Sequence, residues 1–346
     1  PQGRSLFDED YFNKYVGSGN DKLLDYDAQE IRKIFQQRYR HFWNLPGLKT
    51  FMAEFPCYPI LDDHDIVDNW GADPAHQEPQ WKSLGLGARW AYLDYQGTRM
   101  IAPPQELPSE FHYVIEYGSI AVFVMDIRSQ RRAGDNGQLY SDAQQAEFEN
   151  FLKKNQDKKM LFVVLSVPIV HLPRLLARLM STLPPSGEDF SDRWSSGKHV
   201  EDRDRFLEIL HDHQISHPEQ PVVLLSGDIH IGCVHRIRWN KKEPDLFQVV
   251  SSPISHSISP MIGWGSNLLI RMNRKISTLD GKLKGKVRLL KGVKGYRKNP
   301  YIKMNVAIVE ISTPSSGAIP KAEFFLYGHE GVEPVCVYRS GRISTQ

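Results

Sequence analysis

The chain has 346 residues, of which 40% are apolar and 24% are charged, as is typical of soluble globular proteins. A net charge of +2 gives no global attraction to a polyanion such as nucleic acid, and no apolar run of about 18 residues predicts a membrane span. The three cysteines, Cys57, Cys233 and Cys336, are too few and too scattered for a disulfide framework or a zinc knuckle.

The first part of the chain predicts two helices and then a short strand. Apolar residues at helical spacing predict a helix from about residue 26 to Pro46, where a Pro-Gly pair ends it. A second short helix is expected around residues 48–52. The run "YPIL" at 58–61 predicts a buried strand, and the acidic motif "DDHD" at 62–65 follows its carboxyl end.

The middle of the chain alternates helical and strand patterns. A helix is predicted over 86–97, and residues 111–126 predict a hairpin that turns at Gly118. Ser141 and Gln144 form a capping-box pattern at the start of the next helix. The uninterrupted apolar run at 158–170 is typical of a central strand that is covered on both faces.

The last part predicts a helix over 200–213 and then mostly strands. The expected strands are 221–228, 235–240, 246–252, 304–312, 322–328 and 334–340. Of these, 304–312 and 322–328 are expected to form a closing antiparallel pair, and 334–340 is expected as a last short strand. Strands that alternate with helices in one region and form hairpins in another predict a mixed α/β fold. We therefore expect two sheets packed face to face with helices outside.

Two acidic motifs follow apolar runs, "DDHD" at 62–65 and "GDIH" at 227–230. Ligands of α/β sheets bind beyond the carboxyl ends of strands, so we expect the two motifs to be halves of one site. Carboxylates and imidazoles suit di- or trivalent cations, and two such ions can hold both oxygens of a phosphoryl displacement. A bound cation would also offset the repulsion among the clustered aspartates.

The motifs "LDDHDIVDNWG" and "LSGDIHIG" resemble the signature pair of PhoD-like (alkaline phosphatase D) metallophosphatases, a branch of the calcineurin-like metallophosphoesterases. The sequences "FVMDIRSQR", "SDRW" and "VVSSPIS" agree with that family in order and spacing, and the resemblance covers about 55–340. It implies an α/β fold, a calcineurin-like two-sheet β-sandwich flanked by helices in four layers, α/β/β/α. The implied function is a metal-dependent phosphatase or phosphodiesterase, in which two metals assist the attack of water or hydroxide on phosphorus.

The resemblance also implies a set of metal ligands. Asp63 falls where a metal-ligating Asn usually stands in the superfamily, and Asp228 and His230 fall on its last ligand pair. Asn69 is a further candidate ligand or phosphate contact. Relatives suggest two metal ions in the complete protein, iron with calcium or other divalent ions.

Further residues receive roles in catalysis and substrate binding from the same resemblance. His64 would donate to the phosphoryl oxygens or protonate the leaving group, and Asp65 would orient it. Arg128 and Arg193 could neutralise a phosphate, because a guanidinium fork fits its oxygens. Trp194 is a candidate substrate contact, although a core or lid position is the commoner role of such an aromatic.

One family motif is not found in this sequence. Its early Gly-Asp-x-x-Tyr segment supplies the Asp that bridges the two metals, and "LFDEDYF" near the start has Asp8 and Asp10 but no Gly and no preceding apolar strand. We therefore expect an N-terminal part to be absent, with 1–54 a helical lead-in or lid and 55–346 the phosphatase domain. The alternative is a catalytically incomplete phosphate-binding or interaction module. Localisation is left open between cytoplasmic and exported.

The segment 271–303 is strongly basic, with twelve Lys and Arg against Asp280 alone, a net charge of +11. It is either a solvated, flexible excursion between strands or an electrostatic collar for an anionic substrate, lipid headgroups or a partner surface. Few aromatics interleave, which disfavours stacking on single-stranded nucleic acid. The expected substrate is a phosphate ester, either small and soluble or a phospholipid or polymer phosphate, and the oligomeric state is left open.

Overall fold

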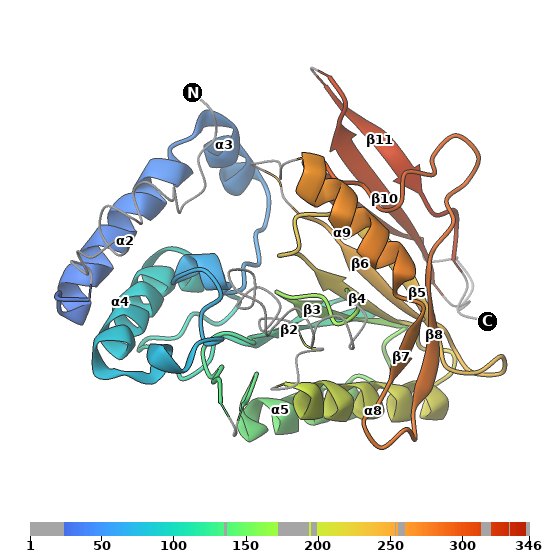
Figure 1. Ribbon diagram of the computed structural model, residues 1–346, viewed down its shortest axis with the longest axis horizontal. Coiled ribbons are helices and arrows are strands. Elements are labelled where there is room, and N and C mark those ends of the chain that lie inside the picture. Colours follow the sequence, from blue (N-terminus) through green and yellow to red (C-terminus); the bar gives the residue numbers. More distant parts are fainter. Residues whose placement is uncertain are drawn as a thin grey trace. The chain divides into compact units, whose positions relative to one another are not determined.

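The chain divides into two compact units in the computed structural model (Figure 1). The first comprises Pro1–Tyr113 and Asp126–Tyr140, and the second comprises Val114–Met125 and Ser141–Gln346. The structure describes residues 24–134, 137–171, 194, 199–252, 254, 260–312, 320–331 and 333–343. Within these ranges no helix is both long and apolar enough to cross a membrane. The division into a lead-in over 1–54 and a domain over 55–346 stays a prediction.

The first unit is helical. Among its described residues it contains α2 (Ala28–Trp43), α3 (Pro46–Glu54), α4 (Pro79–Tyr95) and the short turns η1 (Asp63–Asp65), η2 (Pro74–Gln77) and η3 (Gly97–Arg99). The two helices predicted before residue 55 are confirmed, and the helix predicted over 86–97 is the second half of α4. Helices α2 and α4 bury a common core that includes Ile31, Phe35 and Tyr92. Gly87 brings them close, because a Cβ there would lie 2.5 Å from the Ala28 carbonyl oxygen.

The strand predicted at 58–61 is wrong, because these residues form no strand. Pro59 has no N–H to donate to a sheet, and its carbonyl oxygen accepts a hydrogen bond from the Tyr113 hydroxyl at 2.7 Å. Tyr58 is 45% exposed, whereas Leu61 is completely buried. The first acidic motif therefore follows an irregular segment, anchored by one leucine, and not a strand.

The second unit contains an eight-stranded mixed sheet. Its strands are β1 (Tyr113–Tyr117), β2 (Ile120–Met125), β3 (Met160–Leu165), β4 (Val222–Ser226), β5 (Cys233–Arg238), β6 (Leu246–Val250), β7 (Lys275–Ser277) and β8 (Lys284–Leu289). The order is β1-β2-β3-β4-β6-β5-β8-β7, with β2, β3, β4 and β6 parallel and β5, β8 and β7 antiparallel. The apolar run at 158–170 supplies β3, which is central and buried as predicted.

A second, three-stranded antiparallel sheet packs on one face of the large sheet. It consists of β9 (Asn305–Ser312), β10 (Lys321–His329) and β11 (Pro334–Arg339), in the order β11-β10-β9. Phe247 of β6 and Phe324 of β10 meet with ring centroids 5.9 Å apart, and Val223 and Leu326 belong to the same apolar cluster. The predicted antiparallel closing strands and the two-sheet packing are confirmed.

Helices α5 (Asp142–Lys154) and α8 (Val200–Ser216) lie side by side along the large sheet (Figure 1). Phe123 of β2 contacts Phe148 of α5 at 5.1 Å between ring centroids, and Phe148 contacts Phe206 of α8 at 5.2 Å. The predicted cap of α5 is confirmed, since the Ser141 hydroxyl accepts a hydrogen bond from the Gln144 N–H at 3.0 Å. A third helix, α9 (Pro260–Met272), precedes β7.

Candidate metal centre

The first acidic motif forms a tight turn that holds Asp63 inside the protein. Asp63 is 2% exposed. One of its carboxylate oxygens accepts the backbone N–H of His64 and the other that of Asn69, each at 2.9 Å. Asn69 has a left-handed backbone (φ 55°), a conformation that asparagine tolerates better than most residues. The chain therefore folds back on itself at Asn69, and the two hydrogen bonds fix the direction of the Asp63 carboxylate.

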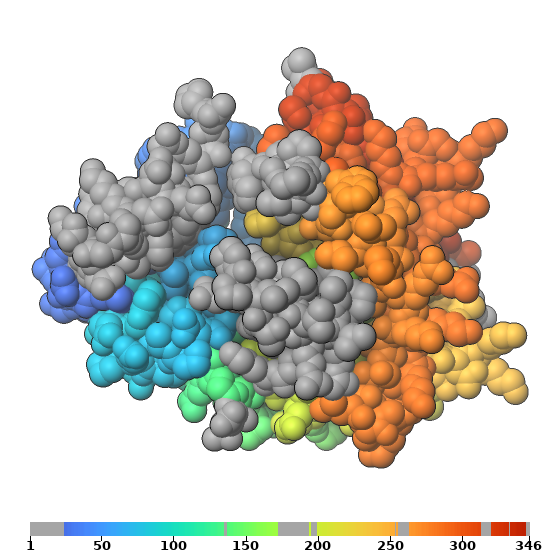
Figure 2. All heavy atoms as spheres, viewed as in Figure 1, coloured from blue at the N-terminus to red at the C-terminus, as the bar shows by residue number. Residues whose placement is uncertain are grey.

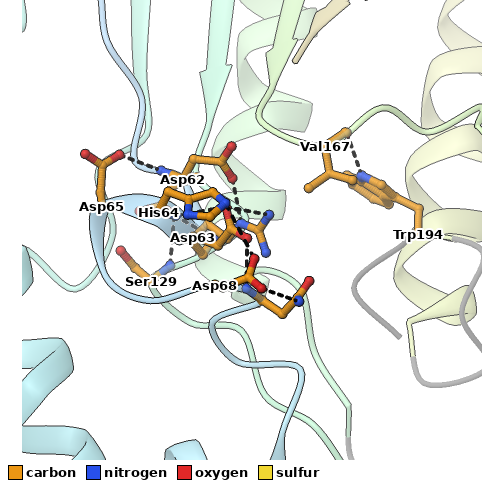
Figure 3. Close-up of polar contacts among 11 residues, drawn as sticks. Asp62, Asp63, His64, Asp65, Asp68, Ser129, Val167 and Trp194 are labelled. Carbon is orange, nitrogen blue, oxygen red and sulfur yellow. Dashed lines mark hydrogen bonds and ion pairs between the residues drawn. The ribbon is translucent and has the colours of Figure 1, made fainter. Parts of the chain in front are cut away.

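His64 and Asp68 lie beside Asp63 (Figure 3), and both side chains are partly exposed. The His64 Nε2 atom is 3.5 Å from the Asp68 carboxylate, and the two side chains are 43% and 62% exposed. Asp63, His64 and Asp68 can each offer one ligand atom, and these atoms all lie within 4.8 Å of one another. Two carboxylates and an imidazole are donors that suit a divalent cation, so these residues fit a metal.

Arg128 supplies positive charge to the same motif from a segment far along the chain. The Asp126 carboxylate accepts the backbone N–H groups of Arg128 and Ser129 at 2.9 Å, which shapes the turn after β2. The Arg128 Nε then donates to Asp62 at 2.8 Å, and its Nη2 lies 3.6 Å from Asp63. Its side chain is completely buried. The guanidinium that was predicted to neutralise phosphate is thus directed at the acidic motif.

Asp65 contacts residues other than the histidine it was expected to orient. Its carboxylate accepts the Tyr39 hydroxyl at 2.6 Å, the Gln96 amide at 3.0 Å and the Asp62 N–H at 3.0 Å. Burial raises the pKa of Asp65 to about 6. These hydrogen bonds connect the turn to the helices of the first unit. The carboxylate next to the His64 ring is that of Asp68. Sequence reasoning missed Tyr39 and Gln96, for which the motif carries no local signal.

The second motif occupies the loop between β4 and β5 in the second unit. Asp228 and His230 both have left-handed backbones (φ 65° and 55°), which is uncommon for residues other than glycine. Ile229 and Ile231 are buried and anchor the loop, while Asp228 and His230 are half-buried. The loop follows the carboxyl end of a central parallel strand, where ligand-binding residues are commonly found.

Of the two residues predicted to contact substrate, the structure describes Trp194 alone, and it is buried. Trp194 is 1% exposed, and its indole N–H donates to the Val167 carbonyl at 3.0 Å (Figure 3). Its ring also packs against Phe206. It is a core residue, because both its ring and its polar atom are already engaged. Arg193 lies outside the described residues, as do Asp8 and Asp10.

Within the first unit, the structure brings together Arg128 and the predicted residues of the first motif, Asp63, His64, Asp65 and Asn69. Asp228 and His230 belong to the second unit and follow β4 as predicted. Their convergence with Asp63 on one site stays a prediction.

Comparisons with known proteins agree with this fold. The family model described as PhoD-like phosphatase matches residues 15–289. A solved structure described as "Structure of PhoD" is similar with a TM-score of 0.56 and 13% sequence identity, over 88% of this chain. The match spans 59% of the length of that other chain, and at this identity it establishes the fold alone. A search of curated proteins finds no match.

Proposed function

Because the chain belongs to the PhoD-like phosphatase family, we propose that it is a metal-dependent hydrolase of phosphoric esters. The observation that carries this proposal is the buried carboxylate of Asp63 with the His64 and Asp68 side chains within 4.8 Å of it, which places a metal ligand next to a candidate proton donor and the carboxylate that orients that donor. The family match supports the phosphatase activity, and the donor set supports the dependence on metal. The class of ester, monoester or diester, is decided by the assay described below.

The different exposure of the residues in the first motif supports a different role for each. Asp63 is buried and held by two backbone N–H groups, so it suits a fixed metal ligand. His64 is more accessible and lies next to Asp68, so it suits a donor to the phosphoryl oxygens or to the leaving group. We assign to Asp68 the orienting role that the sequence suggested for Asp65. Arg128 is a positioning residue that offsets the charge of Asp62 and Asp63.

The second motif supplies further ligands in this proposal. Asp228 offers a carboxylate and His230 an imidazole, and the left-handed backbone at both residues fixes the direction in which each side chain leaves the loop. A bound divalent ion would act as a Lewis acid and would lower the pKa of a coordinated water. The metals themselves, iron with calcium or other divalent ions, are to be identified by elemental analysis.

The proposal is tested with the purified 346-residue chain and two kinds of substitution. Metal content is measured by elemental analysis, and hydrolysis is measured with p-nitrophenyl phosphate and its bis ester. Asp63→Asn is expected to lose metal and activity together. His64→Gln is expected to retain metal and to lose about 10²–10³ in kcat, the usual cost of removing one electrostatic donor.

Asp157→Asn is the matched control, because Asp157 is exposed in a turn of the second unit, outside both motifs. It should behave like the native chain in both measurements. Native turnover by Asp63→Asn, or by metal-loaded His64→Gln, would contradict the assigned roles. A native chain that binds metal and phosphate but hydrolyses neither ester would be a binding module.

A further inference from the structure

The first acidic motif is a turn whose two ends are joined by Asp65. The backbone N–H of Asp65 donates to the Asp62 carbonyl oxygen at 3.2 Å. In return, the backbone N–H of Asp62 donates to one oxygen of the Asp65 carboxylate at 3.0 Å (Figure 3). Asp63 and His64, the candidate metal ligand and the candidate proton donor, lie between these two residues. The position of the Asp65 carboxylate therefore affects the shape of the turn that carries them.

The second oxygen of the Asp65 carboxylate is held by two side chains of the helical core. The Tyr39 hydroxyl on α2 donates to this oxygen at 2.6 Å, and the Gln96 amide, directly after α4, donates to it at 3.0 Å. The Gln96 amide also lies 3.3 Å from the Tyr39 hydroxyl. Donors from two helices thus converge on one carboxylate oxygen, while the other oxygen closes the turn.

The Tyr39 ring is fixed by its neighbours. It is 2% exposed, stacks on Tyr95 of α4 at 5.2 Å between ring centroids, and meets Trp43 edge-on at 6.3 Å. Figure 2 shows part of α4, in cyan, at the surface, whereas Tyr39 is buried. The packing of α2 on α4 therefore determines where the donor to Asp65 lies.

The turn is also held through Asp62 and Asp63, by a charge. Arg128 donates to the Asp62 carboxylate at 2.8 Å and lies 3.6 Å from the Asp63 carboxylate. This contact offsets negative charge, whereas the contact of Tyr39 with Asp65 is a directional hydrogen bond between neutral and acidic groups. Replacing a residue that orients a metal ligand by hydrogen bonding typically changes metal affinity 10–100-fold. Tyr39 acts one step further from the ligand, so we expect an effect at the lower end of this range.

We propose that Tyr39 and Gln96 are positioning residues, which act through Asp65 to hold the first acidic motif in the shape that binds metal. Helix α2 is then a structural part of the metal centre. A buried hydroxyl that only satisfied a carboxylate would change the stability of the fold and leave the metal affinity of the folded chain as it was. The inference rests on the proposed metal-dependent function, and metal affinity is the quantity that tests it.

The test is the affinity of the full 346-residue chain for Mn²⁺, an ion that carboxylate ligands suit. It is measured by electron paramagnetic resonance of the free ion, at a temperature at which circular dichroism shows every variant to be folded. Tyr39→Phe keeps the stacked ring and loses the donor, so its dissociation constant should rise about tenfold. Tyr95→Phe is the matched control, because it removes the hydroxyl of the neighbouring ring, which accepts from Arg40 at 2.9 Å. It should bind Mn²⁺ as the native chain does.

A double-mutant cycle tests whether Tyr39 acts through Asp65. Asp65→Ala removes the acceptor and should weaken Mn²⁺ binding as well. Adding Tyr39→Phe to Asp65→Ala should then change the affinity little further, whereas independent effects would multiply. Gln96→Met keeps the length of the side chain and removes its amide, and it should weaken Mn²⁺ binding in the same direction as Tyr39→Phe.

Three outcomes would overturn the proposal. The first is native Mn²⁺ affinity in folded Tyr39→Phe, and the second is an equal loss in Tyr39→Phe and Tyr95→Phe. The third is a cycle in which the losses of Tyr39→Phe and Asp65→Ala multiply. A native chain that binds Mn²⁺ but hydrolyses neither ester would contradict the proposed hydrolase and leave this test valid. A native chain that binds no Mn²⁺ would contradict both.

Discussion

At the scale of single residues, Arg128 compensates the charge of an otherwise repulsive acidic turn. Its side chain is completely buried between Asp62 and Asp63, and its backbone is fixed by Asp126. A buried charge that loses its partner is costly, because no water replaces the lost interaction. The turn and the arginine are therefore a single unit of structure.

We predict that Arg128→Met lowers the free energy of unfolding by about 3 kcal/mol, since Asp62 and Asp63 would lose their buried counter-charge. Urea unfolding followed by circular dichroism measures this change. The control is Arg205→Met, whose ion pair with Asp142 is exposed and should contribute less than about 1 kcal/mol. Equal unfolding midpoints for Arg128→Met and the native chain would contradict the compensating role.

We predict that His235 on β5 makes the free energy of unfolding depend on pH. It is completely buried, and burial lowers its pKa to about 4. The folded state thus resists protonation while the unfolded chain, with a pKa near 6.5, accepts it. Above about pH 6.5 the neutral His235 leaves the free energy of unfolding undiminished. As pH falls toward 4, protonation of the unfolded chain lowers this free energy by about 3 kcal/mol in total.

His235→Gln should remove this part of the pH dependence, because glutamine does not titrate. The free energy of unfolding would be measured by urea titration at pH 7 and at pH 4.5 for both proteins. We expect a smaller loss between the two pH values in the variant. An identical loss in both would show that His235 is not responsible.

The residue scale also shows what the sequence could and could not provide. Asp63 and His64 were predicted because their motif is contiguous. Arg128 was predicted as a site residue, but its ion pair with Asp62 was not. The two residues are 66 positions apart, and a local sequence pattern cannot indicate a contact over that separation. Asp65 was linked to His64 by adjacency alone, whereas consecutive side chains of a tight turn point in different directions.

At the scale of elements, local sequence patterns predicted the helices and hairpins correctly. They failed at 58–61, where a single proline prevents the strand that the apolar residues indicated. The Ser141 cap, the turn at Gly118 and the run that forms β3 were all visible as sequence patterns. The strand expected at 58–61 was wrong because Pro59 removes a donor that a ladder needs. Apolar character alone does not make a strand.

We predict that Gly87→Ala destabilises the packing of α2 on α4 by about 1–3 kcal/mol. A Cβ at this position would lie 2.5 Å from the Ala28 carbonyl oxygen and 2.7 Å from the Ile31 side chain, so the helices would have to move apart. Thermal unfolding measures the effect. Gly47→Ala in α3 is the control, since a Cβ there meets nothing within 4 Å and alanine favours helix. A higher melting temperature for Gly87→Ala would contradict the prediction.

At the scale of the whole molecule, the second unit depends on the core between its two sheets. Phe324→Ala should cost about 3–5 kcal/mol, because Phe324 is completely buried against Phe247. Ile308→Ala on the neighbouring strand should cost less than about 1 kcal/mol, since Ile308 is 43% exposed. Chemical unfolding of both variants measures the two losses in free energy of unfolding, which can then be compared. Similar losses would mean that the sheets share less of a core than their contacts indicate.

The sandwich could be predicted at this scale because its strands follow from local patterns and from a family resemblance. The exposed faces of the basic segment 271–303 and of α9 could not be predicted, because they depend on how each element packs on the rest of the unit. Lys275 and Lys286 are eleven residues apart in sequence and face each other only through the pairing of β7 with β8. Exposure of Trp264 likewise results from tertiary packing and not from its neighbours in sequence.

The short strand β7 also has a consequence for self-association. It ends the eight-stranded sheet, and an unprotected sheet edge can recruit strands from other molecules and initiate aggregation. β7 has only three residues, begins with an exposed lysine and adjoins the exposed lysines of β8. Short length and repelling charge are two ways in which proteins prevent such polymerisation. The exposed cations of β7 and β8 therefore keep neighbouring molecules apart in solution.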